Sequence, residues 1–257
     1  MTLSRPLADG FPRRIFYGRR LGRPLRPRQR ALLAARLPEI EVVLPSPGGA
    51  AAADQLNLAD MFGPKTSEAG HRIWLEIGFG DGGHLLDQAR QRPGTGFIGC
   101  EPYVNGVAKL LASMEQSGRE DAPVRNIRIF PDDGRALLVA LPRDTVERAF
   151  LLFPDPWPKK RHQKRRFVSE ETLDQLARVL AAGAEFRFAT DHPEYCRWTL
   201  YQVIRHGAFE WLAETPENWR DRLPDWPKTR YEAKARAAGR RCYYLRFRRL
   251  SDPSRGK

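Results

Sequence analysis

Residues 153–166 combine an acid, an aromatic ring and a run of cations in one short block. The block reads Phe-Pro-Asp-Pro-Trp-Pro-Lys-Lys-Arg-His-Gln-Lys-Arg-Arg and follows an apolar run, residues 149–153. That run is typical of a buried strand, which ends at the prolines because proline cannot donate to a ladder. Asp155 is therefore expected at the carboxyl end of a strand, where open α/β sheets bind ligands. Prolines on both sides of Asp155 favour this interpretation over a solvated basic loop.

A second motif follows the apolar run 73–77. Gly78, Gly80 and Gly83 have the G-x-G-x-x-G spacing of a nucleotide-type cofactor loop. Glu101 ends the next apolar run about 20 residues further on, where a ribose-binding acid belongs. This pattern is shared by dinucleotide enzymes and S-adenosylmethionine enzymes.

Two acids at the loop distinguish these cofactors. Glu76 precedes the glycines and Asp81 lies among them, so a pyrophosphate bound there would face like charges. S-adenosylmethionine carries a sulfonium and an ammonium instead of a phosphate, and Glu76 would be a favourable neighbour for them. The acids therefore predict S-adenosylmethionine. After a third apolar run, Asp132 or Asp133 could accept a hydrogen bond from the adenine amine, although a simple Asp-Asp-Gly turn is the alternative.

Apolar runs alternate with helical patterns between residues 73 and 190. Strands are expected at 73–77, 97–100, 127–130, 149–153 and 186–189. Helices are expected at 83–90, from about Asn105 to before Gly118, and from an N-cap at Ser169 to a C-cap at Gly183. This alternation predicts an α/β fold with a doubly wound, mostly parallel sheet. A late pair, 209–212 and 243–247, is expected to form an antiparallel edge hairpin.

The charge of the chain indicates its partner. A net charge of +13 and a pI near 10.1 favour a polyphosphate such as a nucleic acid. Residues 1–38 contain ten arginines and one acid, and are expected to order on a partner. We therefore divide the chain into a basic, partly flexible arm and loop, 1–70, and a catalytic domain, 71–257.

Other classes of protein are disfavoured by composition. No apolar run approaches the ~20 residues of a membrane span, and the start lacks the apolar segment of a signal peptide. Cys100, Cys196 and Cys242 are odd in number and scattered, which favours buried thiols in a reducing cytoplasm. The five histidines show no metal-ligand spacing, so no metal is expected.

Together these motifs resemble one family, the bacterial tRNA (guanine-N7-)-methyltransferases, over residues 73–244. The resemblance implies a class I methyltransferase (Rossmann-like) sheet, S-adenosylmethionine as cofactor, and methylation of the variable-loop guanosine of tRNA, position 46. The chain is expected to act as a monomer or homodimer. Carried over by motif position, the cofactor contacts are Glu76, Gly78, Gly80, Glu101, Asp133 and Asp155.

The resemblance also assigns residues to the substrate. It implies that Asp155 is the active-site acid and that the substrate contacts are Lys159, Asp191, Thr229, Arg230, Tyr231 and Glu232. The family's late Thr-Lys-Phe-Glu motif is Thr-Arg-Tyr-Glu here, and an arginine is not equivalent to a lysine at a phosphate or base edge. The cations expected to position tRNA through phosphates are Lys159, Lys160, Arg161, Lys164, Arg165 and Arg166.

Guanine N7 has an in-plane lone pair, so catalysis is expected to come from positioning and from carboxylates near the ring. Two alternatives remain from sequence. An exocyclic-amine nucleic-acid methyltransferase is one, because Asp155-Pro-Trp partly resembles the motif that binds an amino group. A non-enzymatic tRNA-binding protein with the same fold is the other.

Overall fold

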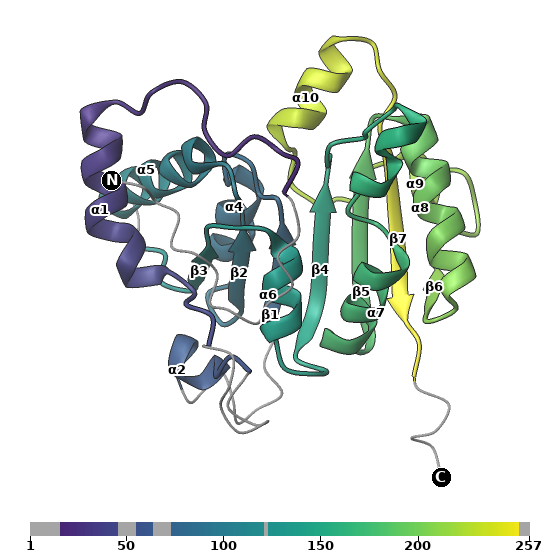
Figure 1. Ribbon diagram of the computed structural model, residues 1–257, viewed down its shortest axis with the longest axis horizontal. Helices are drawn as coiled ribbons and strands as arrows, with labels where there is room; N and C mark the ends of the chain where they lie inside the picture. The colour runs from purple at the N-terminus through teal and green to yellow at the C-terminus, as the bar shows by residue number, and fades with distance from the viewer. Residues whose placement is uncertain (1–15, 46–54, 64–72, 121–122, 252–257) are drawn as a thin grey trace.

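The computed structural model describes residues 16–45, 55–63, 73–120 and 123–251. In this part of the chain, helices cover both faces of a seven-stranded sheet of order β3-β2-β1-β4-β5-β7-β6 (Figure 1). Strands β1 to β5 pair in parallel, whereas β7 runs antiparallel to both β5 and β6. The doubly wound, mostly parallel sheet with an antiparallel edge is thus confirmed.

The seven strands are β1 (Ile73–Ile77), β2 (Gly96–Cys100), β3 (Ile127–Phe130), β4 (Val146–Leu152), β5 (Leu180–Thr190), β6 (Phe209–Trp211) and β7 (Tyr243–Arg249). Every residue of β1 and β2 is buried, as expected for parallel strands covered on both faces. Ile77 is in register with both Cys100 and Leu151. Neighbouring strands therefore end at one edge, and the loops that follow them lie side by side.

Two apolar clusters flank the sheet. One is formed with α1 (Pro27–Ile40), α4 (Gly83–Gln91), α5 (Val104–Glu120) and α10 (Arg230–Ala237). The other is formed with α6 (Gly134–Ala140), α7 (Glu170–Val179) and α8 (Pro193–His206). The remaining helices are short: α2 (Leu58–Phe62), α9 (Glu217–Arg220) and the 3-10 helix η1 (Lys160–Arg165). Cys100, Cys196 and Cys242 are free and buried, as predicted.

Two helix ends differ from the sequence prediction. Ser169 caps α7 as expected, because its hydroxyl accepts the N–H of Thr172. The expected C-cap at Gly183 is wrong, since α7 ends at Val179 and Leu180 already pairs with Val146 in the sheet. Gly118 lies inside α5, not beyond its end. At Gly183, pairing of β5 with β4 overrides the local signal for a helix end.

The arm is more ordered than its composition predicted. Residues 27–40 form α1 without any partner, and its Leu32, Leu33 and Leu37 are buried in the cluster that includes α5. The helix was not predicted, because the many arginines made this segment appear polar throughout. The preceding segment is also fixed, since Gly22 N–H donates to Asn105 Oδ1 at 2.8 Å. The first 15 residues lie outside the described part of the chain, and the division at residue 70 stays a prediction.

Candidate active site

Five acids lie at the carboxyl ends of five parallel strands. Glu76 is in β1, and Glu101, Asp133, Asp155 and Asp191 follow β2, β3, β4 and β5. The parallel sheet thus brings the predicted acids to one edge, the ligand-binding edge of such folds.

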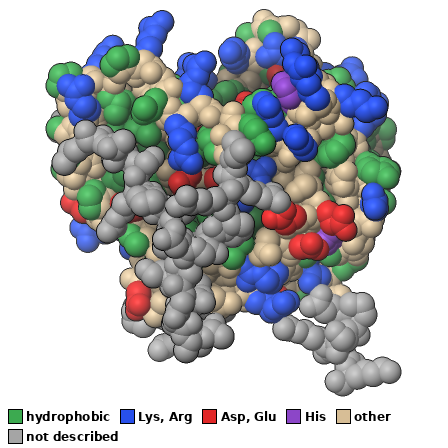
Figure 2. Space-filling model, in the orientation of Figure 1, with side chains coloured by type: hydrophobic (Ala, Val, Ile, Leu, Met, Phe, Trp, Pro, Cys, Tyr) green, Lys and Arg blue, Asp and Glu red, His purple; other side chains and the backbone are tan. Residues whose placement is uncertain are grey.

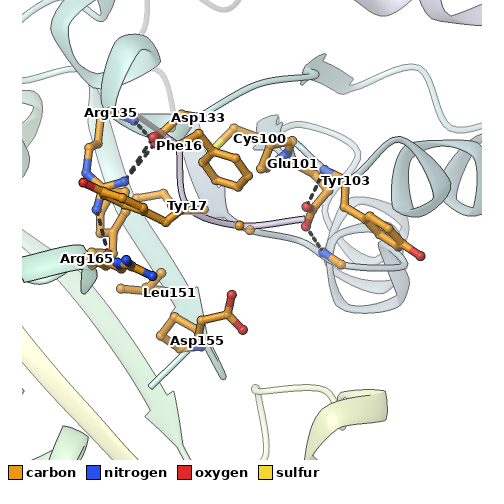
Figure 3. A pocket seen from close by; sticks show the side chains of 18 of the residues that line it. Phe16, Tyr17, Cys100, Glu101, Tyr103, Asp133, Arg135, Leu151, Asp155 and Arg165 are labelled. Atoms are coloured by element: carbon orange, nitrogen blue, oxygen red, sulfur yellow. Dashed lines mark hydrogen bonds and ion pairs between the residues drawn. The ribbon is translucent and has the colours of Figure 1, made fainter. Parts of the chain in front are cut away.

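A cavity of about 790 Å³ opens at this edge. It is lined by Gly78, Gly80, Glu101, Asp133 and Asp155, so five of the six predicted cofactor contacts meet in one space (Figure 3). Its volume is typical of a site for a small molecule or cofactor. That these five residues contact a cofactor stays a prediction.

Glu101 is the most constrained of these acids. Its Oε2 accepts the N–H of Gly80 at 2.7 Å and its Oε1 accepts the N–H of Tyr103 at 2.9 Å (Figure 3). Burial raises the pKa of Glu101 to about 7, against the opposing effect of the two backbone donors. Each carboxylate oxygen has further acceptor capacity, as a pair of ribose hydroxyls would require.

The glycines of the cofactor loop have distinct roles. Gly78 and Gly80 adopt φ of 73° and 63°, a region that suits glycine. A Cβ at Gly78 would meet nothing within 4 Å, so here the backbone geometry, and not a lack of space, favours glycine. Gly106, on α5, was missed by sequence analysis. A Cβ at Gly106 would lie 2.1 Å from the Gly80 carbonyl oxygen, so its absence lets α5 approach the loop.

Glu76 does not line the main cavity. It is buried and lies 2.7 Å from His84 Nδ1, and the two residues border a smaller adjoining hollow. The His84 ring packs edge-on against Phe150, with centroids 4.8 Å apart. No role for His84 was predicted from sequence, because its partner is eight residues away across a turn. The pairing holds Glu76 beneath the cofactor loop.

Asp133 caps a helix and also lies at the cavity, and its hydrogen bond to an adenine amine stays a prediction. Its carboxylate caps α6 by accepting the Arg135 N–H, and it also pairs with the Arg135 guanidinium at 3.1 Å. It nevertheless lines the cavity. Asp132 instead pairs with Arg20 at 2.7 Å, which ties the N-terminal segment to the end of β3. Asp133 is thus the one of the two acids placed at the cavity.

Asp155 lies on a loop with unusual backbone geometry. Phe153 and Trp157 have φ of 51° and 43°, and both are bulky residues for which the left-handed region is unfavourable. The loop is attached to β5 by a 2.7 Å bond from Phe153 N–H to Ala189 O. The Asp155 carboxylate points into the cavity mouth (Figure 3). Partial removal from water raises its pKa.

Aromatic residues of the N-terminal segment also line the cavity, which the sequence did not indicate. Phe16 and Tyr17 lie against it (Figure 3). The Arg165 guanidinium lies 4.3 Å from the Tyr17 ring centroid and 4.9 Å from that of Trp157. Tyr17 and Trp157 also meet edge to face, with centroids 6.4 Å apart. Trp157 therefore packs against neighbouring side chains at the rim.

The late motif 229–232 packs onto the cofactor loop. Thr229 caps α10 by accepting the Glu232 N–H at 3.0 Å, and Arg230 pairs with Asp81 at 3.6 Å. The Tyr231 ring lies against Gly80 and lines the cavity. Glu232 is buried and paired with two arginines of the surrounding structure. A substrate contact by these four residues stays a prediction, and the geometry of Glu232 favours a structural role.

The other predicted substrate residues are further from the cavity. Lys159 is exposed just before η1. Asp191 pairs with Arg240 at 2.6 Å and does not line the cavity. Arg166 requires a correction: it was expected to contact phosphate, but its side chain has 0% exposure. Charge alone could not show which cation of the block points inward.

The surface charge follows the same edge. Figure 2 shows many Lys and Arg side chains along the upper rim of the molecule, above the carboxyl ends of the parallel strands. Others lie lower on this face, beside a group of acidic side chains. Among the described residues, no cluster of three or more metal-ligating side chains occurs. None of the helices described is long and apolar enough to cross a membrane.

Comparison with known proteins first defines the class. A mutant 16S rRNA (adenine(1408)-N(1))-methyltransferase from Catenulisporales acidiphilia, solved with cosubstrate SAM, has a TM-score of 0.51 at 17% identity. The match covers 79% of this chain and 95% of that one, and it shows the fold. A family model described as "Putative methyltransferase" matches residues 71–245. The fold is that of a class I methyltransferase.

Sequence relatives then define the family. A tRNA (guanine-N(7)-)-methyltransferase of Ruegeria pomeroyi is 50% identical over 244 residues, covering 93% of this chain and 96% of that protein. One of Rhizobium meliloti is 48% identical over 234 residues, covering 91% and 94%. The chain belongs to the tRNA (guanine-N(7)-)-methyltransferase family, as its motifs predicted.

Proposed function

We propose that this protein transfers a methyl group from S-adenosylmethionine to guanine N7 in tRNA, at the variable-loop guanosine of position 46. The observation that carries the proposal is the cavity at the strand ends, which gathers Glu101, Asp133 and Asp155 beside the glycine loop. The names of the relatives support the same reaction. We further propose that it works in the cytoplasm as a monomer or homodimer.

The donor set of the cavity fits S-adenosylmethionine. Glu101 presents two carboxylate oxygens with spare acceptor capacity, held by the N–H groups of Gly80 and Tyr103. Such an acid suits the two hydroxyls of a ribose. The nearby acids Glu76 and Asp81 would repel a pyrophosphate but not a cationic sulfonium. The fit therefore favours this cofactor over a dinucleotide.

The reaction needs orientation more than proton transfer. S-adenosylmethionine supplies an electrophilic methyl group, and guanine N7 already carries the attacking lone pair. The chain has to hold the base in line and exclude water, which is where most of the rate enhancement of such a displacement originates. The Asp155 carboxylate at the cavity mouth would stabilise the positive charge that develops on the guanine ring.

The substrate must reach the cavity as an accessible base. Duplex RNA hides N7 in a deep, narrow groove, so a loop guanosine, or one turned out of its stack at a cost of a few kcal/mol, is the expected target. The exposed cations of η1, with Lys159 beside them, would position the tRNA through its phosphates. Asp191 would accept from the guanine N1–H and amine once released from Arg240.

Nucleoside analysis tests this proposal. Unmodified tRNA is incubated with the protein and methyl-labelled S-adenosylmethionine, digested and separated. The expected product is 7-methylguanosine, and it should vanish when the guanosine at position 46 is replaced by adenosine. A peak of N6-methyladenosine would instead support an exocyclic-amine enzyme, which is disfavoured because prolines flank Asp155 instead of following it as a pair. Absence of any labelled nucleoside would support a non-enzymatic tRNA-binding protein.

A further inference from the structure

Arg166 is the one cation of the 159–166 block with a fully buried side chain. Its Nε donates to the carbonyl of Pro156 at 2.9 Å, and its Nη2 donates to the carbonyl of Trp157 at 3.4 Å. Its Nη1 donates to Glu194 Oε1 at 3.0 Å, and Nη2 also donates to Glu194 Oε2. Four of the five N–H groups of the guanidinium are therefore used inside the protein.

The faces of the guanidinium are covered as well. The rings of Tyr195 and Trp198 lie with their centroids each 5.0 Å from the Arg166 Cζ. Both rings belong to α8, as does Glu194, which lies in the first turn of that helix. A phosphate oxygen would have to displace these partners before it could reach Arg166. The side chain is built into the protein between the loop and α8.

The loop that Arg166 holds is the one that carries Asp155. Left-handed backbone at Phe153 and Trp157 costs on the order of 1–3 kcal/mol each and persists only where the surroundings fix it. Arg166 binds the two carbonyls directly after Asp155, on the side of the loop next to α8. No lysine could reproduce this geometry, because an ammonium lacks the planar fork that binds a carboxylate and adjacent carbonyls together.

We propose that Arg166 is a positioning residue that fixes the Asp155 loop against α8 through Glu194, and that it makes no contact with tRNA. This inference rests on the proposed function, since it concerns the loop of the same site. Two further bonds support the role. Gln163 Nε2 donates to Glu194 Oε1 at 3.0 Å, and Arg135 donates to the Arg166 carbonyl at 3.2 Å. The Arg166 hydrogen bonds also lower the pKa of Glu194, which favours its carboxylate form.

Three variants test the proposal: Arg166→Lys, Glu194→Gln and, as a control, Lys160→Gln, which changes an exposed cation of the same block. Arg166→Lys and Glu194→Gln are expected to lower kcat at saturating tRNA by about tenfold or more. The salt slope of tRNA binding should stay at the wild-type value in both. Lys160→Gln should raise KM for tRNA and reduce that slope by about one unit.

Glu194→Gln carries the sharpest contrast. Its side chain is 36% exposed, so the variant is expected to fold even if Arg166→Lys does not. The Glu194 carboxylate competes with phosphate for Arg166. If Arg166 bound a tRNA phosphate, removing this competitor would strengthen tRNA binding and leave kcat unchanged. That result would overturn the proposal, as would a reduced salt slope with normal kcat in Arg166→Lys.

Hydrogen exchange gives a readout that does not depend on activity. In the protein without cofactor or tRNA, the hydrogen-bonded amides of Phe153, His162 and Arg166 should exchange at least about tenfold faster in Glu194→Gln than in wild type, while those of β1 remain unchanged. Equal exchange in this loop would overturn the positioning role. If wild type makes no 7-methylguanosine but the exchange difference is present, the proposed function fails and the Arg166 loop attachment stands.

Discussion

The carboxylate of Glu101 accepts the backbone N–H of Gly80 at 2.7 Å, so the acid that ends β2 fixes the loop that follows β1. The bond joins the two sequence motifs expected to hold a cofactor, 21 residues apart along the chain. It also means that the loop conformation and the acid that we propose binds the cofactor are one structural unit.

Replacing Glu101 should weaken the binding of the cofactor. Glu101→Ala removes up to two charge-assisted hydrogen bonds to ribose hydroxyls, each worth roughly 1.5–3 kcal/mol. We expect the dissociation constant for S-adenosylmethionine, measured by calorimetry, to rise by at least about tenfold. A thermal melt provides the control, since the sheet should remain folded. An unchanged dissociation constant would show that this strand end is not the ribose site.

The same residue predicts a pH dependence. The pKa of Glu101 is raised to about 7, so its ionised form, which we propose accepts from the ribose, is lost as pH falls through 7. Cofactor affinity should therefore be about tenfold weaker at pH 6 than at pH 8, from the fraction ionised at each pH. The raised pKa of Asp155 acts in the same direction. Glu101→Gln should flatten the profile, and a steep profile that persists in this variant would contradict the assignment.

Gly106 should be intolerant of a methyl group. In Gly106→Ala the new Cβ would lie 2.1 Å from the Gly80 carbonyl oxygen. The cofactor loop or α5 must then shift, at a cost of about 1–3 kcal/mol, and S-adenosylmethionine should bind about tenfold or more weakly. Gly118→Ala is the matched control on the same helix, because its Cβ would meet nothing closer than 3.7 Å. It should stabilise α5 by about 0.5–1 kcal/mol without weakening cofactor binding. Equal cofactor affinity in both variants would rule out the close approach.

The N-terminal arginines should act on tRNA affinity. Arg19 and Arg23 are both exposed, and Arg19 lies at the cavity, which it helps to line. The double variant Arg19→Gln/Arg23→Gln should flatten the dependence of log affinity on log salt by about two units. Truncating the arm would also remove Phe16 and Tyr17 from the cavity wall, whereas substitution keeps both rings and tests the two arginine side chains. Arg143→Gln is the control, since Arg143 is exposed before β4 at the opposite edge. An unaltered salt slope in the double variant would show that Arg19 and Arg23 do not contribute to tRNA binding.

The sheet and its acids could be predicted from sequence because both are local signals. An apolar run followed by a turn places an acid such as Glu101 or Asp155 at a strand end, and parallel strands bring these ends together. The partners of side chains distant in sequence could not be predicted. Arg166 looked like its cationic neighbours until Glu194, 28 residues later, was shown beside it. Likewise His84 meets Glu76 only through the folded turn.

The order of the N-terminal arm was also not predicted from sequence. Arg-rich composition predicted disorder, yet Leu32 and Leu37 supply α1 with a buried side. Composition averages over a segment and misses a few apolar residues that can pack on a neighbouring helix. The position of Gly106 was equally invisible, because only the folded helix brings it against the carbonyl of Gly80.

The charge on Asp155 is the central claim of the proposed mechanism, and single-turnover methylation tests it most directly. Asp155→Ala is compared with wild type at saturating tRNA and S-adenosylmethionine, and 7-methylguanosine is quantified over time. We expect the rate to fall by about 10² or more, because transition-state stabilisation is lost, while the tRNA dissociation constant changes by less than about threefold. A near-normal rate in Asp155→Ala under these saturating conditions would contradict the electrostatic role of this carboxylate.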